Sequence, residues 1–384
     1  MNYSNFKIES KVLSSIEIYI VVTGIIDTIS SETFGKHVYE CHNKYPKSKI
    51  TIDFTKVEMI TSACMRYLLK FKKDEINYEL VGVKREVYTV LKLSGMSEVL
   101  NIEQETISVD TTGCKLLGKG FHSEVYKLND ETIAKVYYDL PDIDMLITER
   151  IIAKQAFVKG VPTEISFGLC ESDGKAGLVY ELVDAETLLS IFSKDDSSIE
   201  KYVKDYVEIV KKINTFDSEG IIEIPKAKDI LGNDVNYLKD YLNINEYQTL
   251  SNILNSVEDS NHLLHGDPHP ANVMLTNKGM VFIDLSDMRT GNKLFDLVYL
   301  NRTLIQFQKF PDNYALNKEQ CNKLWTLFVN EYYKDESNVE RELAIIDVLS
   351  LTSITVKFLM KDVTSENGYT LLEELKNKLN NWLY

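Results

Sequence analysis

The stretch that decides the fold lies in the second half of the chain and reads His265-Gly266-Asp267-Pro268-His269-Pro270-Ala271-Asn272. Pro268 and Pro270 exclude a regular helix here, so these residues must form a shaped loop. An apolar segment that ends in an acid follows, Val281-Phe282-Ile283-Asp284. The loop therefore offers an acid and an amide, and the end of an expected strand offers a second acid.

An acid, an amide and a second acid in this order form the set that metal-assisted phosphoryl transfer needs. One carboxylate orients the attacking hydroxyl, while an amide oxygen and the second carboxylate hold magnesium on the phosphates of ATP. We therefore expect Asp267 to orient and deprotonate the acceptor hydroxyl, and Asn272 and Asp284 to bind magnesium. His265 is expected to pack and hydrogen-bond so that it fixes the loop.

The spacing of this loop resembles the catalytic loop of aminoglycoside phosphotransferases and choline kinases. Ordinary protein kinases carry an arginine at the position of Gly266, usually a lysine at that of His269, and Phe-Gly in place of Leu285-Ser286. The resemblance extends over residues 113–384. It implies a phosphotransferase that uses ATP and magnesium to phosphorylate the hydroxyl of a small molecule.

Two upstream motifs fit the phosphate-binding part of such a site. A turn between two expected strands contains Gly118 and Gly120 and leads to Ser123, whose hydroxyl and backbone neighbours are candidate phosphate contacts. Lys135, on the next strand, can reach the α- and β-phosphates, and Glu149 in the following helix would hold it. Taken alone, each motif is also typical of an ordinary hairpin or a solvated surface.

A third upstream segment, Tyr180-Glu181-Leu182-Val183, ends the last expected strand. It resembles the hinge whose backbone binds adenine in this family, with a carbonyl at Glu181 and an amide at Val183. From residue 187 onward the pattern is mainly helical, apart from the loop. Five strands and one helix followed by a helical body are typical of a two-lobed kinase-like fold.

Two alternatives concern the acceptor side of the site. A transition-metal site from His262, His265 and His269 is one, but the spacing matches neither a helical HExxH motif nor a zinc knuckle. The other is an aromatic box for a quaternary ammonium group, although an aromatic stripe on a helix is more often core. Its candidates recur with helical spacing: Phe307, Phe310, Trp325, Phe328, Tyr332 and Tyr333.

The first hundred residues have the pattern of a small α/β domain. Strand-like alternation from Ile16 to Val22 is followed by helical and strand segments in turn. The segment Ile52-Asp53-Phe54 and the run from Val57 to Cys64 are similar to the STAS domain, the fold of anti-sigma-factor antagonists. That family carries Asp-Ser-x-Gly, with a phosphorylatable serine at a helix start. Here Thr61-Ser62-Ala63-Cys64 keeps the serine alone, so Ser62 is a candidate regulatory phosphosite, or simply a helix N-cap.

Together these patterns predict a multidomain chain of α/β and α+β class, a STAS-like domain followed by a two-lobed protein-kinase-like fold. The expected boundaries are 1–105 for the STAS-like domain, 106–112 for a linker, 113–183 for the kinase N-lobe and 184–384 for the C-lobe. The C-lobe would contain the catalytic loop at 264–272 and the metal-binding strand end at 281–287.

The distribution of charge along the chain limits the classes of molecule that the protein is expected to bind. The first 105 residues carry equal numbers of basic and acidic side chains, so the net charge of −15 belongs to the rest of the 384 residues. This charge disfavours nucleic acid and anionic membranes and is compatible with a cationic acceptor, although many soluble proteins are acidic for solubility alone. The apolar run from Leu343 to Met360 contains Asp347 and Lys357, which indicates a buried helix and no membrane span. Five dispersed cysteines fit reduced thiols in a cytoplasm.

The sequence leaves three functions open. The first is a small-molecule phosphotransferase that its STAS domain regulates or localises through a protein partner. The second is a scaffold that senses nucleotide and signals through the STAS domain, although Lys135, Glu149, Asp267, Asn272 and Asp284 are all intact. The third is a kinase with a protein acceptor, Ser62 being one candidate; the absence of an Ala-Pro-Glu segment disfavours it.

Overall fold

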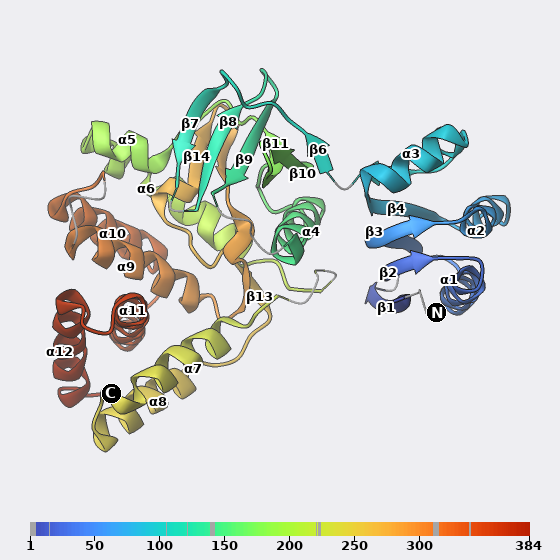
Figure 1. Cartoon of the computed structure of the whole chain (residues 1–384). Coiled ribbons are helices and arrows are strands. Elements are labelled where there is room, and N and C mark those ends of the chain that lie inside the picture. The colour runs from blue at the N-terminus through green and yellow to red at the C-terminus, as the bar shows by residue number, and fades with distance from the viewer. Residues whose placement is uncertain are drawn as a thin grey trace. The chain divides into compact units, whose positions relative to one another are not determined.

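The computed structural model describes residues 5–14, 16–104, 106–120, 122–138, 143–219, 221, 224–309, 315–337 and 339–384. The chain forms two compact units. One contains Met1–Lys154, Ile165–Leu182 and Glu219–Ile222, and the other contains the remaining residues. The first unit holds two separate sheets, while the second is mostly helical (Figure 1).

The N-terminal domain is a five-stranded sheet with three helices. Its strands are β1 (Lys7–Ser14), β2 (Glu17–Ile26), β3 (Lys49–Ile60), β4 (Tyr78–Val83) and β5 (Ile102–Gln104). They lie side by side in sequence order, with β1 antiparallel to β2 and every later pair parallel. The helices are α1 (Ser30–Lys44), α2 (Ser62–Lys73) and α3 (Arg85–Leu93).

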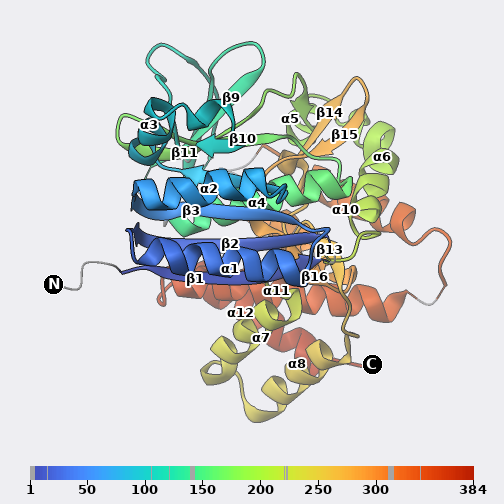
Figure 2. The ribbon, with the colours of Figure 1, turned by 90° about the vertical axis from the view of Figure 1, so that its right-hand side faces the viewer.

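The core of this domain follows from the alternation seen in the sequence. Every second residue of β2 is buried, and α1 and α2 lie side by side over one face of the sheet (Figures 1 and 2). Phe34 of α1 lies between Phe54 of β3 and Phe71 of α2, with ring centroids 6.1 and 5.8 Å apart. Strand β1 was not predicted, because most of its side chains are exposed and show no alternation.

A six-stranded sheet follows, in the order β6-β10-β11-β9-β8-β7. Its strands are β6 (Thr106–Ser108), β7 (Lys115–Lys119), β8 (Ser123–Lys127), β9 (Thr132–Tyr137), β10 (Ser166–Ser172) and β11 (Lys175–Glu181). Helix α4 (Ile143–Lys159) connects β9 to β10 along the chain. Five of the strands and the helix correspond to the predicted N-lobe.

The sixth strand differs from the prediction. The segment 106–112 was expected to be a linker, yet Thr106–Ser108 form β6, which pairs in parallel with Leu169, Cys170 and Glu171 of β10. The backbone N–H of Val109 then donates to the Glu171 carbonyl at 2.9 Å. Because β5 ends at Gln104, a single residue separates the last strand of one sheet from the first strand of the next. Short polar strands of this kind carry too little apolar pattern to be recognised in sequence.

The C-terminal unit is helical around two small sheets. The helices are α5 (Leu188–Lys194), α6 (Ser197–Ile213), α7 (Ala227–Tyr237), α8 (Ile244–Ser256), α9 (Leu294–Lys309), α10 (Lys318–Tyr332), α11 (Glu340–Lys361) and α12 (Glu366–Asn380). One sheet contains β12 (Glu186–Thr187), β14 (Val273–Thr276) and β15 (Gly279–Phe282), and the other pairs β13 (His262–Leu264) with β16 (Arg289–Gly291).

Helix α11 contains the long apolar run noted in the sequence. Among the described residues it is the one helix long and apolar enough to cross a membrane, and its most apolar window is 67% buried inside the protein. It packs against α9 and α12, and the Ser350 hydroxyl donates to the Val298 carbonyl of α9 at 3.0 Å. The apolar residues of α11 therefore serve as core, as the sequence predicts for a buried helix.

Candidate active site

The loop from His265 to Asn272 is held by a buried carboxylate on α9. The backbone N–H groups of His265 and Gly266 donate to Asp296 at 3.2 and 2.9 Å, and Asn214 donates to it at 2.8 Å. Burial raises the pKa of Asp296 to about 6, although these three hydrogen bonds oppose the effect. Asp296 therefore positions the start of the loop and is fully shielded from solvent.

Gly266 is required by this geometry. Its φ of +80° is a left-handed conformation, and a Cβ atom there would lie 1.8 Å from the backbone oxygen of Asp287. No side chain fits at this position, which explains why an arginine cannot take the place of Gly266 in this loop.

His265 and Tyr206 complete the support of the loop. The fully buried His265 ring accepts the Asp267 N–H at Nδ1 (3.3 Å), so its Nε2 carries the proton and donates to the Ile283 carbonyl (3.2 Å). Burial lowers the pKa of His265, which favours this neutral form. The hydroxyl of buried Tyr206 donates to the Pro268 carbonyl. His265 thus fixes the loop against the strand end, as its place in the sequence predicts.

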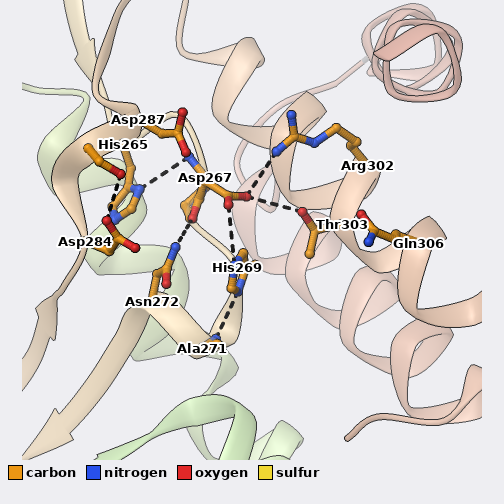
Figure 3. A network of polar contacts seen from close by, with 12 residues as sticks. His265, Asp267, His269, Ala271, Asn272, Asp284, Asp287, Arg302, Thr303 and Gln306 are labelled. Carbon is orange, nitrogen blue, oxygen red and sulfur yellow. Dashed lines mark hydrogen bonds and ion pairs between the residues drawn. The ribbon is translucent and has the colours of Figure 1, made fainter. Parts of the chain in front are cut away.

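Asp267 lies at the centre of the polar network in Figure 3. Its Oδ1 is 3.3 Å from both Arg302 Nη2 and Thr303 Oγ1 of α9, and its Oδ2 is 3.5 Å from His269 Nε2. Burial by itself would raise the pKa of Asp267, but the contact with His269 and the charge of Arg302 outweigh burial and hold that pKa well below its usual range. Asp267 is therefore ionised and ready to accept a hydrogen bond from a hydroxyl.

The two predicted metal ligands come from the two sides of one hairpin. Val273 of β14 lies opposite Phe282 of β15, and the Ile283 N–H donates to the Asn272 carbonyl at 3.0 Å. Asn272 and Asp284 therefore lie at the same end of the hairpin (Figure 3). Asp284 adopts a left-handed φ of +59°, which Asp tolerates better than most residues.

This pair suits magnesium. The Asn272 amide nitrogen donates to the Asp267 carbonyl at 3.0 Å, so the amide oxygen is its coordinating atom. Magnesium binds hard oxygen ligands and typically takes only one or two from the protein, the rest being water and phosphate. No group of three His, Cys, Asp or Glu side chains could hold a metal ion in the part of the chain that the structure describes.

The alternative transition-metal site from three histidines also lacks suitable geometry. His262 is exposed, whereas both ring nitrogens of His265 and of His269 face protein groups: Nδ1 of His269 accepts the Ala271 N–H at 3.2 Å. The described geometry therefore does not bring these three histidines into a metal site.

In the six-stranded sheet, Lys135 and Glu149 are brought together. Lys135 Nζ of β9 is 3.1 Å from Glu149 Oε1 of α4, which is buried. The hydroxyls of Tyr137 and Tyr180 also donate to Glu149, each at 2.8 Å. The two tyrosine hydroxyls therefore hold the Glu149 carboxylate in the position where it pairs with Lys135. The two tyrosines were missed in the sequence because tyrosine is an ordinary strand residue.

The predicted phosphate-contacting turn lies between β7 and β8. The Gly120 N–H donates to the Ser123 carbonyl at 2.8 Å, and Ser123 begins β8. A Cβ atom at Gly118 would meet nothing within 4 Å, and one at Gly120 only Ser123, so packing in the described structure does not require either glycine. Phe121 of this turn lies outside the described residues.

The remaining predicted positions lie at the end of a strand and at the start of a helix. Glu181 ends β11 and Val183 follows it, while the Glu181 N–H is bonded to the Ile165 carbonyl at 2.9 Å. In the N-terminal domain Ser62 is the exposed first residue of α2, and Thr61 occupies the N-cap position. The interpretation of Ser62 as a helix cap is therefore wrong by one residue.

The aromatic stripe is mainly core. Phe307, Phe328, Tyr332 and Tyr333 are all at most 5% exposed, and the rings of Phe328 and Tyr332 stack 6.0 Å apart. Phe310 lies outside the described residues. Four of the six candidates are thus unavailable to a ligand, and the plainer reading of the stripe as core holds for them.

Sequence reasoning missed the residues that approach Asp267 from the helices. Arg302 and Thr303 lie 35 and 36 residues after Asp267 on α9, and Gln306 follows one turn later. Lys357 of α11 donates to the Gln306 side chain at 3.1 Å. One feature of the sequence could have indicated these residues: Arg302 is a charged residue within a helix whose other residues are mostly buried.

The sequence model described as the phosphotransferase enzyme family (APH) matches residues 113–319, over half of the chain. The chain belongs to this phosphotransferase family. A STAS model matches residues 7–108, so the N-terminal domain is a STAS domain. The predicted fold class, a STAS domain followed by a kinase-like fold, is confirmed. A comparison with curated proteins gave no match.

Solved structures of several phosphotransferases and of a choline/ethanolamine kinase family protein resemble the chain at low identity. A ternary complex of APH(2")-IIa with streptomycin and ATP is 13% identical, covers 71% of this chain and 93% of its own, and has a TM-score of 0.45. A choline/ethanolamine kinase family protein from Mesorhizobium loti is 14% identical (69% and 87% covered, TM-score 0.48). The macrolide 2'-phosphotransferase MphH from Brachybacterium faecium is 12% identical (77% and 99%, TM-score 0.43). The family assignment rests on the sequence match.

Proposed function

We propose that this protein transfers the γ-phosphoryl group of ATP to a hydroxyl of a small molecule, with magnesium, under the control of its STAS domain. The observation that carries the proposal is the joint placement of Asp267, Asn272 and Asp284 by one loop and one hairpin. The amide and the second carboxylate lie together at the hairpin end, while Asp267 faces away from them toward α9 (Figure 3).

The roles of these residues follow from their surroundings. Asp267 would accept the hydrogen bond of the acceptor hydroxyl and take its proton, as the oxygen bonds to the γ-phosphorus and the bond to ADP breaks. Asn272 and Asp284 would hold magnesium, which neutralises charge on the phosphates. Lys135, fixed by Glu149, would bind the α- and β-phosphates. Gly118, Gly120 and Ser123 would contact them, and the backbone of Glu181 and Val183 would bind adenine.

Calorimetry with ATP tests the nucleotide and metal roles. We expect magnesium to strengthen ATP binding to the natural protein, and Asp284→Ala to remove most of that strengthening because one of two protein ligands is lost. Ser286→Ala is the matched control, because it removes only the 2.8 Å hydrogen bond to Asp284. If ATP fails to bind at millimolar concentration with magnesium present, the phosphotransferase proposal is wrong.

A second candidate is that the kinase site phosphorylates Ser62. The exposure of Ser62 at the start of α2 favours it, since a helix N-terminus tolerates a phosphate dianion. Mass spectrometry after incubation with ATP and magnesium would then find phosphate on Ser62 of the natural protein and none in Asp267→Asn. Unmodified Ser62, there and in protein from its native cell, would leave the STAS domain as a constitutive docking module.

A further inference from the structure

Positive charge gathers beside Asp267, on the side away from the metal ligands. We name this set the basic face: Arg302, Thr303 and Gln306 of α9, with Lys357 of α11. Figure 3 shows Asp267 between Asn272 and Asp284 on one side and the three α9 residues on the other. Because the phosphoryl group approaches from the metal side, the body of an acceptor bound to Asp267 would lie against the basic face.

The carboxylates around this face are already engaged. Asp267 bonds to Arg302 and Thr303, and Asp287 forms a 2.7 Å ion pair with Arg289. Asp234 of α7 also faces Arg302; burial raises its pKa to about 6, so it stays mostly ionised at neutral pH, and Ser353 bonds to it. None of these contacts neutralises Lys357, whose bond at 3.1 Å is to the neutral amide of Gln306.

The two cations of the basic face also act on each other. Partial burial lowers the pKa of Lys357, and the charge of Arg302 lowers it further, while Asp267, Asp287 and the neighbouring Lys361 have smaller effects. Arg302 keeps donor capacity as well: its Nε is buried and has no hydrogen-bond partner among the described residues. A bound anion would relieve the repulsion between Lys357 and Arg302 and use both groups.

We propose that the hydroxyl acceptor carries an anionic group, a carboxylate or a phosphate, that binds to Lys357 and Arg302 beside Asp267. This inference rests on the proposed function. It reverses the expectation of a cationic acceptor drawn from the net charge, because groups within a few ångströms outweigh charges that lie beyond the Debye length of about 8–10 Å.

ADP release with chemically matched acceptors tests the inference. The panel contains glycerol, glycerate, glycerol 3-phosphate, ethanolamine and choline, extended to larger polyols, sugar acids and sugar phosphates. We expect kcat/KM to be at least about tenfold higher for one anionic class than for its neutral and cationic analogues, the usual scale for a charged hydrogen bond. The carboxylate and phosphate members show which anion is preferred.

Two variants of α11 sharpen the test. Lys357→Gln should raise KM for the preferred anionic acceptor about ten- to a hundredfold while ATP binding stays unchanged. Lys361→Gln, one turn further on the same helix and exposed like Lys357, removes the same charge without touching the bond to Gln306, and should change KM less than about twofold. Thermal unfolding with inorganic phosphate or acetate gives a readout without turnover. At least one of these anions should stabilise the natural protein and Lys361→Gln more than Lys357→Gln.

The outcomes distinguish failure of this inference from failure of the proposed function. Preference for neutral or cationic acceptors, or equal kinetics in the two lysine variants, overturns the inference and leaves the phosphotransferase standing. If ATP binds but no acceptor of the panel is phosphorylated, the thermal-unfolding measurement decides. Equal stabilisation of the two lysine variants by phosphate and by acetate then overturns the inference of an anionic acceptor. Failure to bind ATP at all removes the proposed function instead.

Discussion

Asp267→Asn is expected to lower the turnover of the acceptor about a hundred- to ten-thousandfold while ATP affinity stays within a factor of two or so. An amide has the same shape as the carboxylate but cannot take the proton. The Asp267 side chain contacts Arg302, Thr303 and His269, so its replacement does not disturb Asn272 and Asp284 directly. Steady-state ADP release and calorimetry with ATP measure the two quantities.

Thr303→Val is the matched control for that result. It removes one 3.3 Å hydrogen bond to the same carboxylate oxygen but keeps the base, so turnover should fall only several-fold. If the Asp267→Asn variant keeps most of the natural turnover, or if its turnover falls no further than that of Thr303→Val, then Asp267 does not act as the base.

Gly266→Ala is expected to destabilise the protein by more than about 3 kcal/mol and to abolish transfer. The new Cβ atom would lie 1.8 Å from the Asp287 backbone oxygen, and backbone cannot turn aside as a flexible side chain can. Moving the loop to make room would break the hydrogen bonds of His265 and Gly266 to Asp296. Urea denaturation and the ADP-release assay measure the losses.

Gly279→Ala is the control that distinguishes the steric clash at Gly266 from the strain of a positive φ. Gly279 also has a positive φ, +122°, but a Cβ atom there meets nothing within 4 Å. Its alanine variant should therefore lose only about 1–2 kcal/mol, the cost of a left-handed backbone. Equal stabilities of the Gly266 and Gly279 variants would show that the loop relaxes around the new methyl group.

The catalytic loop could be predicted because its functional groups are contiguous. Two prolines, a glycine, an acid and an amide within eight residues define a backbone path, and an adjacent hairpin brings Asp284 to the same place. Local chain geometry alone suffices to place such a set. The N-lobe strands were predictable for a similar reason, since each carries its own apolar pattern.

The basic face was not predictable, because it depends on tertiary packing. Arg302 reaches Asp267 only when α9 packs behind the loop, and Lys357 reaches Gln306 only when α11 packs on α9. A lone arginine or lysine in an apolar helix has no characteristic spacing. The N-cap position of α2 was misplaced by one residue because helix starts are uncertain by a residue; Thr61 occupies it, and its hydroxyl bonds to the Ile26 carbonyl instead of capping the helix.

The short strand β6 has a practical consequence for anyone who separates the two domains. A phosphotransferase fragment that begins at residue 113, where the family match begins, would lack β6 and leave β10 as an unprotected edge. Exposed edges of this kind recruit other chains and promote aggregation. A STAS fragment that runs to residue 108 would instead carry β6 away from its own sheet. The boundary that keeps each sheet whole falls between Gln104 and Thr106, several residues before the kinase motifs begin.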